Sequence, residues 1–117
     1  MSRAKAFASP QARRAAPLFA ALGDETRLLL VARLSANGPE SITALSEGSD
    51  VTRQAVTKHL GVLARAGLAR GQSRGRERIW QLEPGRLSEA REYLDQISRQ
   101  WDVALDRLRT FLENEPR

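Results

Sequence analysis

The side chains best suited to chemistry in this 117-residue chain gather in residues 51–68. On one side of a helix predicted there lie four polar groups: Arg53, Gln54, Thr57 and Lys58. Side chains of these types bond base edges and phosphates in a DNA major groove. Thr52 can cap the start of the helix, because its hydroxyl accepts a first-turn amide proton. The segment predicts a DNA-reading helix, although by itself it also fits an ordinary amphipathic surface helix.

The opposite side of the same segment is apolar. Val56, Leu60 and Leu63 recur at i, i+4 and i+7, the spacing of one buried stripe on a helix. Gly67 allows the chain to leave the helix through a left-handed residue. The start, the buried side and the end of this helix are therefore all visible in the sequence.

The net charge of +5 is unevenly distributed. Residues 1–17 carry +4, residues 18–51 carry −3, residues 52–86 carry +6 and residues 87–117 carry −2. Positive charge concentrated on the reading helix, on the segment after it and on an N-terminal arm indicates phosphate binding. Membrane-surface binding is disfavoured, because the basic segment is not one long amphipathic helix.

Several functional classes are excluded by composition. The chain has no cysteine and a single histidine, His59, so neither a disulfide nor a tetrahedral metal site is expected, and no cofactor is predicted. No catalytic constellation or glycine-rich phosphate loop is present, so an enzyme is the weakest reading. The opening residues lack the apolar region expected of a leader, and no apolar run reaches membrane-spanning length, so a cytoplasmic protein without a membrane partner is expected.

The elements before the reading helix are predicted to be three helices. Ser9 and Pro10 begin the first, and Pro17 is expected to break it into two parts before Gly23. Asp24 caps a second helix that runs to about residue 36. Its inward side chains are expected to be Leu28, Leu30, Val31 and Leu34. Ser41 caps a short third helix with Ile42 and Leu45 inward, and a tight turn then leads into the reading helix, as in a helix-turn-helix.

After Gly67 the pattern changes to short strands. Residues 68–82 predict a hairpin around a turn at Arg74-Gly75, with Trp80 and Leu82 on one face and Arg76 and Arg78 continuing that row. We interpret the arginine-rich tip as a wing that follows the phosphate backbone or enters the minor groove. The alternative is a solvated turn that carries charge for solubility.

A long helix follows Pro84-Gly85. It carries a heptad stripe of Leu87, Ala90, Leu94, Ile97, Trp101, Ala104, Leu108 and Phe111. Roughly 28 residues at ~1.5 Å each make a rod of about 42 Å, longer than so small a domain covers by itself. Pairing with a second chain is predicted, through Leu87, Leu94, Ile97, Trp101, Leu105 and Leu108. The alternative, cover by the first helix of the same chain, can hold in part.

Together these pieces resemble the ArsR family of winged helix-turn-helix transcriptional regulators. The resemblance covers approximately residues 17–112 and rests on Leu-Gly-Asp-Glu-Thr-Arg at 22–27, on residues 51–63, on Gly67-Leu68 and on residues 75–82. It implies a homodimeric bacterial repressor that places the helix beginning at Thr52 in the major groove. It also implies dimerisation through the first and last helices.

The sequence departs from the metal-sensing members of that family. Those members use paired cysteines early in the third helix, or Asp, His and Glu clusters on the last helix. Here residues 41–45 offer no soft ligand and the last helix has no histidine. His59 resembles the family's phosphate-side or packing histidine. Metal sensing is therefore not carried over, and a metal-independent regulator is predicted.

The predicted fold is mainly α with a small β-hairpin, in the order α-α-α-α-β-β-α. Residues 1–16 form a basic arm and the start of helix one, 17–83 the winged helix-turn-helix domain and 84–117 the dimerisation helix. The predicted DNA contacts are Thr52, Arg53, Gln54, Thr57, Lys58, His59, Arg74 and Arg76. The predicted function is a homodimeric repressor on an inverted-repeat operator of double-stranded DNA; the alternative is a protein-interaction module without DNA binding. No effector is indicated.

Overall fold

The computed structural model describes residues 9–48 and 50–114. The elements, in chain order, are α2 (Pro10–Leu22), α3 (Glu25–Asn37), β1 (Glu40–Ser41), α4 (Ile42–Ser46), α5 (Arg53–Arg65), β2 (Ala69–Arg74), β3 (Glu77–Leu82) and α6 (Pro84–Glu113). The predicted fold class is confirmed: the chain is mainly helical, with one hairpin between α5 and α6. The predicted basic arm at Arg3 and Lys5 lies outside the described residues.

All four predicted N-caps are confirmed, and each satisfies an amide that the helix itself leaves without a partner. The side-chain oxygen of Ser9 accepts from Ala12 N at 3.0 Å, that of Asp24 from Arg27 N at 3.0 Å, that of Ser41 from Ala44 N at 3.1 Å and that of Thr52 from Ala55 N at 3.1 Å. Polar side chains at these four points therefore set where α2, α3, α4 and α5 begin.

The predicted break in the first helix at Pro17 is wrong. α2 continues through Pro17 to Leu22. Proline lacks the N–H that would bond the carbonyl of residue 13, yet its fixed φ is itself helical. Buried Ala15, Leu18 and Ala21 lie on both sides of it, while Pro17 is exposed. Packing of this face outweighs the loss of one hydrogen bond.

A three-stranded antiparallel sheet, in the order β1-β3-β2, replaces the expected two strands. In β1, Glu40 pairs with Trp80 and Ser41 with Ile79. Two residues are too few for a period-two pattern, so β1 could not be recognised in the sequence. Strands β2 and β3 are joined by the two-residue loop Gly75-Arg76, and Gly75 has φ +64°. A positive φ at the first loop residue is what a type II′ hairpin turn requires.

The core lies between α2, α3, α4, α5 and the sheet. It is formed by Leu18, Ala21, Leu30, Leu34, Ile42, Leu45, Val56, Leu60, Leu63, Leu68, Ala69, Trp80 and Ala90. The prediction that Leu28 faces inward is wrong, because its side chain is 52% exposed. Leu28, Leu29 and Leu30 are consecutive, and only one of three such positions can point into the core when Leu34 is also buried.

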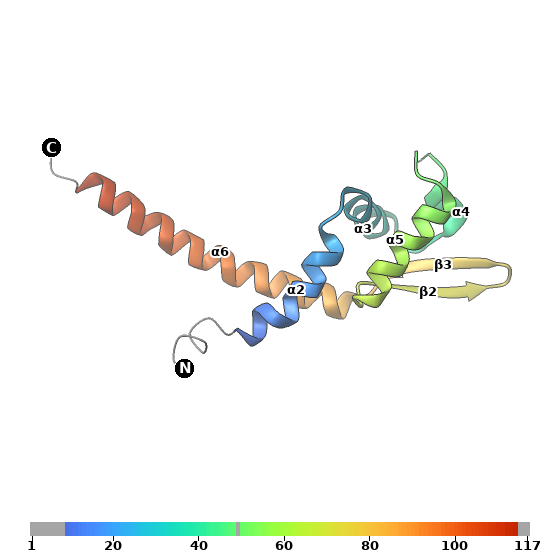
Figure 1. Cartoon of the computed structure of the whole chain (residues 1–117), viewed down its shortest axis with the longest axis horizontal. Helices are drawn as coiled ribbons and strands as arrows, with labels where there is room; N and C mark the ends of the chain where they lie inside the picture. The colour runs from blue at the N-terminus through green and yellow to red at the C-terminus, as the bar shows by residue number, and fades with distance from the viewer. Residues whose placement is uncertain (1–8, 49, 115–117) are drawn as a thin grey trace.

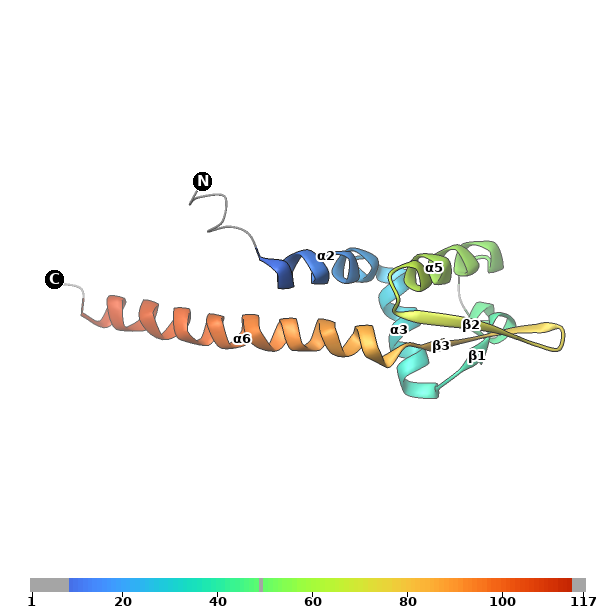
Figure 2. The same cartoon turned by 90° about the horizontal axis from the view of Figure 1, so that it is seen from below.

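α6 makes the molecule elongated. The radius of gyration is 19.6 Å, against about 13 Å expected for a compact chain of this length. Figures 1 and 2 show α6 and the β2–β3 hairpin extending from the body in opposite directions, with α2 alongside the first part of α6. Among the described helices, none is long and apolar enough to cross a membrane.

Candidate nucleic-acid interface

The helix predicted to read DNA is α5, and both of its ends are well defined. At its C-terminus Leu68 N donates to Leu63 O and Gly67 N to Ala64 O, both at 2.9 Å. This pair of bonds, with φ +79° at Gly67, is a Schellman motif. A Cβ at Gly67 would lie 2.9 Å from Arg86 Cγ, so the position favours glycine for its space as well. The helix therefore ends at a defined point before Gly67, and the chain continues from there into the wing.

The two sides of α5 divide as the spacing predicts. Val56, Leu60 and Leu63 are at most 1% exposed. The predicted DNA-contacting side chains on the outer side, Arg53, Gln54, Thr57 and Lys58, are exposed together with the capping Thr52. The Thr57 hydroxyl donates to the carbonyl of Arg53 at 2.9 Å. Thr57 therefore offers a methyl group and an acceptor oxygen outward, while its donor is already used.

His59 lies away from this outer side, with a side chain only 24% exposed. Its Nδ1 is 3.1 Å from Arg27 Nη1 and 3.7 Å from Asp24 Oδ2. A guanidinium is only a donor, so at this contact Nδ1 accepts and the imidazole carries its proton on Nε2. Of the predicted contact residues, His59 is the one that the structure places against another helix of the body.

Arg27 connects three helices, a role that the sequence did not reveal. Its Nε donates to Ala21 O at the end of α2, and its guanidinium meets His59 on α5. Its backbone N–H donates to Asp24, which holds the pKa of that carboxyl below its usual value. The spacing Asp-x-x-Arg indicated the helix cap, but it contained no signal for a contact with a residue 32 positions later. This cluster sets how α5 sits on the body.

The short helix of the helix-turn-helix, α4, is also held in place by a side chain of α3. Arg33 donates from Nε and Nη2 to the two carboxylate oxygens of Glu40, each at 3.0 Å, and from Nη2 to Ala44 O at 2.8 Å. Donation from the Arg33 guanidinium lowers the pKa of the Glu40 carboxyl. α3, β1 and α4 are thus held together under the reading helix, with Ile42 and Leu45 buried.

The arginines of the wing occupy two kinds of position. Arg78 lies over the Trp80 ring, 5.4 Å from its centroid, so it is held on the sheet by a cation–π contact. Arg74 and Arg76 lie at the exposed tip and make no salt bridge within residues 9–48 and 50–114. Arg70, at the base, pairs with Glu83 at 3.1 Å. The charge available to a phosphate is therefore at the tip.

Comparison with known proteins agrees with this geometry. A helix-turn-helix domain family matches residues 22–72. The HTH-type transcriptional regulator Rv2034 of Mycobacterium tuberculosis is 38% identical over 95 residues, which are 81% of this chain and 85% of that protein. An ArsR-like transcriptional regulator from Rhodococcus sp. RHA1 superposes with a TM-score of 0.68 at 31% identity, covering 88% of this chain and 96% of that one.

The chain belongs to the ArsR family of winged helix-turn-helix transcriptional regulators. HlyU from Vibrio cholerae, at 22% identity and a TM-score of 0.63 over 80% of this chain and 98% of that one, shares the fold. The regulator is thus a DNA-binding protein of a family without enzymatic activity.

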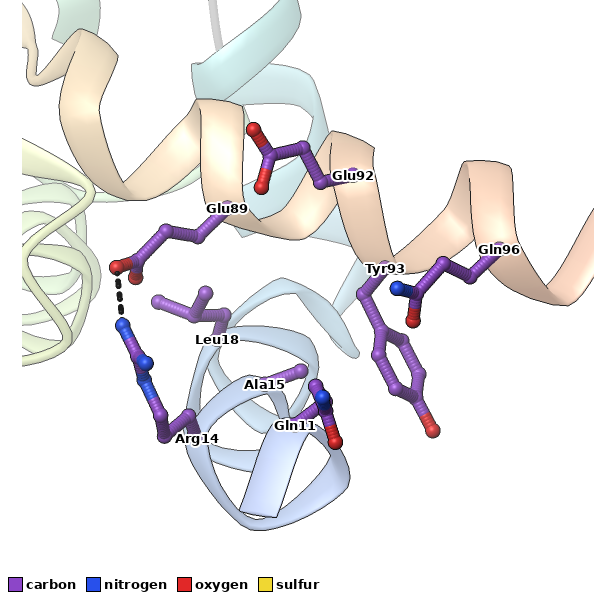
Figure 3. Close-up of a pocket in the computed structure, with 8 residues that line it drawn as sticks. All are labelled: Gln11, Arg14, Ala15, Leu18, Glu89, Glu92, Tyr93 and Gln96. Atoms are coloured by element: carbon purple, nitrogen blue, oxygen red, sulfur yellow. Dashed lines mark hydrogen bonds and ion pairs between the residues drawn. The ribbon is translucent and has the colours of Figure 1, made fainter. Parts of the chain in front are cut away.

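The predicted dimer stripe of this regulator is covered only at its beginning. Figure 3 shows α2 under the first turns of α6, with Leu18 between the helices and Tyr93 extending from α6 along the side of α2. Arg14 is bonded to Glu89 at 2.9 Å. The centroids of the Phe19 and Tyr93 rings are 5.9 Å apart. Within the stripe Ala90 is buried and Leu87 and Ile97 are partly buried. Cover by the same chain therefore ends near Ile97.

Beyond that point the stripe is open. The predicted interface residues Trp101, Leu105 and Leu108 are 53–68% exposed there, and Leu94, before that point, is 51% exposed. Trp101, at 68%, does not pack on the first helix of its own chain, so the cover by that helix does not extend to it. Across the described residues, no cluster of three or more His, Asp or Glu side chains is placed to hold a metal ion.

Proposed function

We propose that this regulator is a homodimeric repressor that binds an inverted-repeat operator. The observation that carries the proposal is the outer side of α5, where four polar or basic side chains are exposed on a helix fixed at both ends. A winged helix that had become a protein-interaction module would not need to keep such a surface. In this proposal residues 17–83 bind DNA and residues 84–117 bring two chains together.

The contacts are proposed to divide by chemistry. Arg53 and Gln54, at the start of α5, suit bidentate bonds to base edges. Thr57 and Lys58 reach bases or phosphates, and Thr52 and His59 reach phosphates. His59 would do so through Nε2–H, because its Nδ1 faces Arg27. Arg74 and Arg76 follow the backbone or enter the minor groove.

The exposed part of α6 supports the dimer. Apolar side chains in a contiguous exposed band are uncommon in monomers and indicate an interaction surface. A two-fold pair presents two α5 helices. To read an inverted repeat in successive major grooves, these helices must lie about 34 Å apart, one turn of duplex, or a multiple of that distance.

The test is a titration of the protein with two duplexes, one from the DNA upstream of its own gene and one of scrambled sequence, followed by fluorescence anisotropy. We expect tight binding to the upstream duplex with a footprint symmetric about its centre, and weaker, strongly salt-dependent binding to the scrambled one. Equal affinity for both duplexes would favour the protein-interaction alternative. Lower transcription from the footprinted promoter on adding protein would establish repression, and higher transcription would contradict it.

A further inference from the structure

A second group of arginines lies at the C-terminal end of the reading helix, away from the wing. One surface hollow there is lined by Arg13 and Arg14 of α2, Arg65 of α5 and Arg86 of α6. Among the described residues that line it, Glu89 is the only acid. Four arginines beside one carboxylate give this surface an excess of positive charge. We call it the arginine hollow.

The carboxylate of the hollow is already bonded through both of its oxygens. Glu89 Oε1 accepts from Arg14 Nη2 at 2.9 Å, and Glu89 Oε2 accepts from Arg86 Nη1 at 3.1 Å. Arg13 and Arg65 are exposed, and within residues 9–48 and 50–114 neither makes a salt bridge. Because a guanidinium only donates, these two groups are available to an anion from outside the chain.

Helix stability accounts for only part of this charge. Arg65 lies in the last turn of α5, where a cation favours the negative end of the helix dipole. Arg13 lies near the start of α2, close to the positive end of that helix, where a cation is unfavourable and where no acid is present in the first turn. The position of Arg13 therefore indicates a role outside its own helix.

Arg65 continues a row of side chains on the outer side of α5. Eleven residues make close to three helical turns, so Arg65 lies on the same side as Gln54 and about 16 Å further along the axis. Lys58 and Gly61 lie between them in this row. A Cβ at Gly61 would lie 3.6 Å from Arg65 Nη1, which is an ordinary contact, so packing does not require glycine there. The row thus leads from the predicted base contacts to the arginine hollow.

α2 and α6 bring their arginines to the same end of α5. Figure 2 shows α2 and α5 in one layer, on the same side of α6 and of the β2–β3 hairpin, and the two helices are in contact. The side chain of Arg86 crosses the end of α5 at Gly67, where its Cγ leaves no space for a Cβ. The hollow therefore borders the outer side of the reading helix.

We propose that the arginine hollow is a second phosphate site of this regulator, which binds the DNA backbone beside the base pairs that α5 reads. The N-terminal residues of a recognition helix contact base edges. Arg65 lies three turns beyond them, where with Arg13 it donates to phosphate oxygens. This inference rests on the proposed placement of α5 on DNA and does not depend on the proposed dimer. A free phosphate is the other source of the same chemistry, and the test separates the two.

Loss of either free guanidinium tests the site. Arg13→Ala and Arg65→Ala should each weaken binding to the upstream and scrambled duplexes by the same factor. Each should also reduce the slope of log affinity against log salt by about one unit. Arg109→Ala, a matched loss of charge at an exposed position near the end of α6, should leave the slope unchanged. Circular dichroism would confirm that all three variants are folded.

Single neutral methylphosphonates in the upstream duplex locate the contact. A replacement beside the base pairs that α5 reads should weaken wild-type binding and should affect Arg65→Ala less, because that variant has already lost the contact. Full sensitivity of Arg65→Ala to every replacement would overturn the site.

Inorganic phosphate without DNA tests the other source at matched ionic strength. A rise in unfolding temperature that Arg13→Ala abolishes, with an unchanged DNA salt slope in that variant, would assign the hollow to a free anion and overturn the proposal. If Arg53→Ala loses discrimination between duplexes while Arg13→Ala and Arg65→Ala keep the wild-type slope, the site is wrong and the proposed function stands. No effect on DNA binding in any of the three would overturn both.

Discussion

α5 and α6 carry the same kind of apolar stripe, but the stripe of α5 is buried whereas most of the stripe of α6 is exposed. Val56, Leu60 and Leu63 of α5 are completely enclosed by their own chain. On α6 only Ala90 is buried, and Trp101 and Leu108 face outward. Both stripes follow helical spacing, so spacing alone does not separate them.

The difference lies in what the rest of the chain can place against each helix. α5 sits among α2, α3, α4 and the sheet, which enclose it on one side. α6 is 30 residues long, and α2, with 13 residues, covers only its beginning. The α5 stripe completes a core, whereas the α6 stripe requires a second surface. Substitutions in the α5 stripe should therefore lower the stability of the fold, and substitutions in the α6 stripe should weaken assembly.

The largest effect is expected inside the body. Leu60→Ala should lower the free energy of unfolding by about 2–5 kcal/mol, because it removes buried methyl groups and leaves a cavity. Urea denaturation followed by circular dichroism would measure it. Leu108→Ala is the matched change on α6, and in dilute protein it should cost far less. Equal losses of unfolding free energy in the two variants at low protein concentration would contradict the contrast between the stripes.

The next effect concerns assembly. Trp101→Glu should give a folded monomer by sedimentation, with helical circular dichroism retained and operator affinity largely lost, because large aromatic side chains dominate interface energies. Val103→Glu, on the opposite side of α6 and also exposed, is the control and should remain a dimer. A wild-type protein that sediments as a monomer and still binds the operator tightly would rule out this role for Trp101.

A third prediction compares the exposed side of α5 with the wing. Arg53→Ala should cost about 1–3 kcal/mol of discrimination between specific and random duplexes, since it removes a base contact. Arg74→Ala should weaken binding to all sequences alike and reduce the salt slope by roughly one unit. Anisotropy titrations at several salt concentrations would measure both. If the two variants lose affinity in the same sequence-independent way, the proposed division of contacts is wrong.

The smallest effect is expected at the ion pair that holds α4. The pKa of Glu40 is lowered in the folded state by donation from Arg33, and that of Asp24 is lowered by the Arg27 amide. Stability from a carboxyl with a lowered pKa is fully present above its unfolded value and is lost as pH falls through the folded one. Unfolding free energy should therefore decline in acid.

Glu40→Gln isolates one part of this decline. At neutral pH it should cost about 1 kcal/mol, as loss of one side-chain hydrogen-bond contribution does. Between neutral and acidic pH the variant should lose less stability than the wild type in urea titrations. An identical acid-induced loss in both proteins would show that Glu40 does not contribute to it.

Local signals were sufficient for most of the body. Ser9, Asp24, Ser41 and Thr52 predicted where four helices begin, and Gly67 where α5 ends, because caps depend on atoms only three or four residues away. The errors have a common cause. Pro17 did not break α2, Leu28 did not turn inward, and β1 was missed, since each outcome depends on contacts with distant elements.

The candidate interface divides in the same manner. The residue types, charges and helical spacing of α5, and the arginines at the hairpin tip, were readable in the chain because they depend on neighbours within a few positions. The sequence did not reveal the attachment of His59 to Arg27 or the point near Ile97 where α6 loses its cover. These depend on how separate elements pack in space, and a periodic pattern specifies which side of a helix is apolar without specifying what will lie against it.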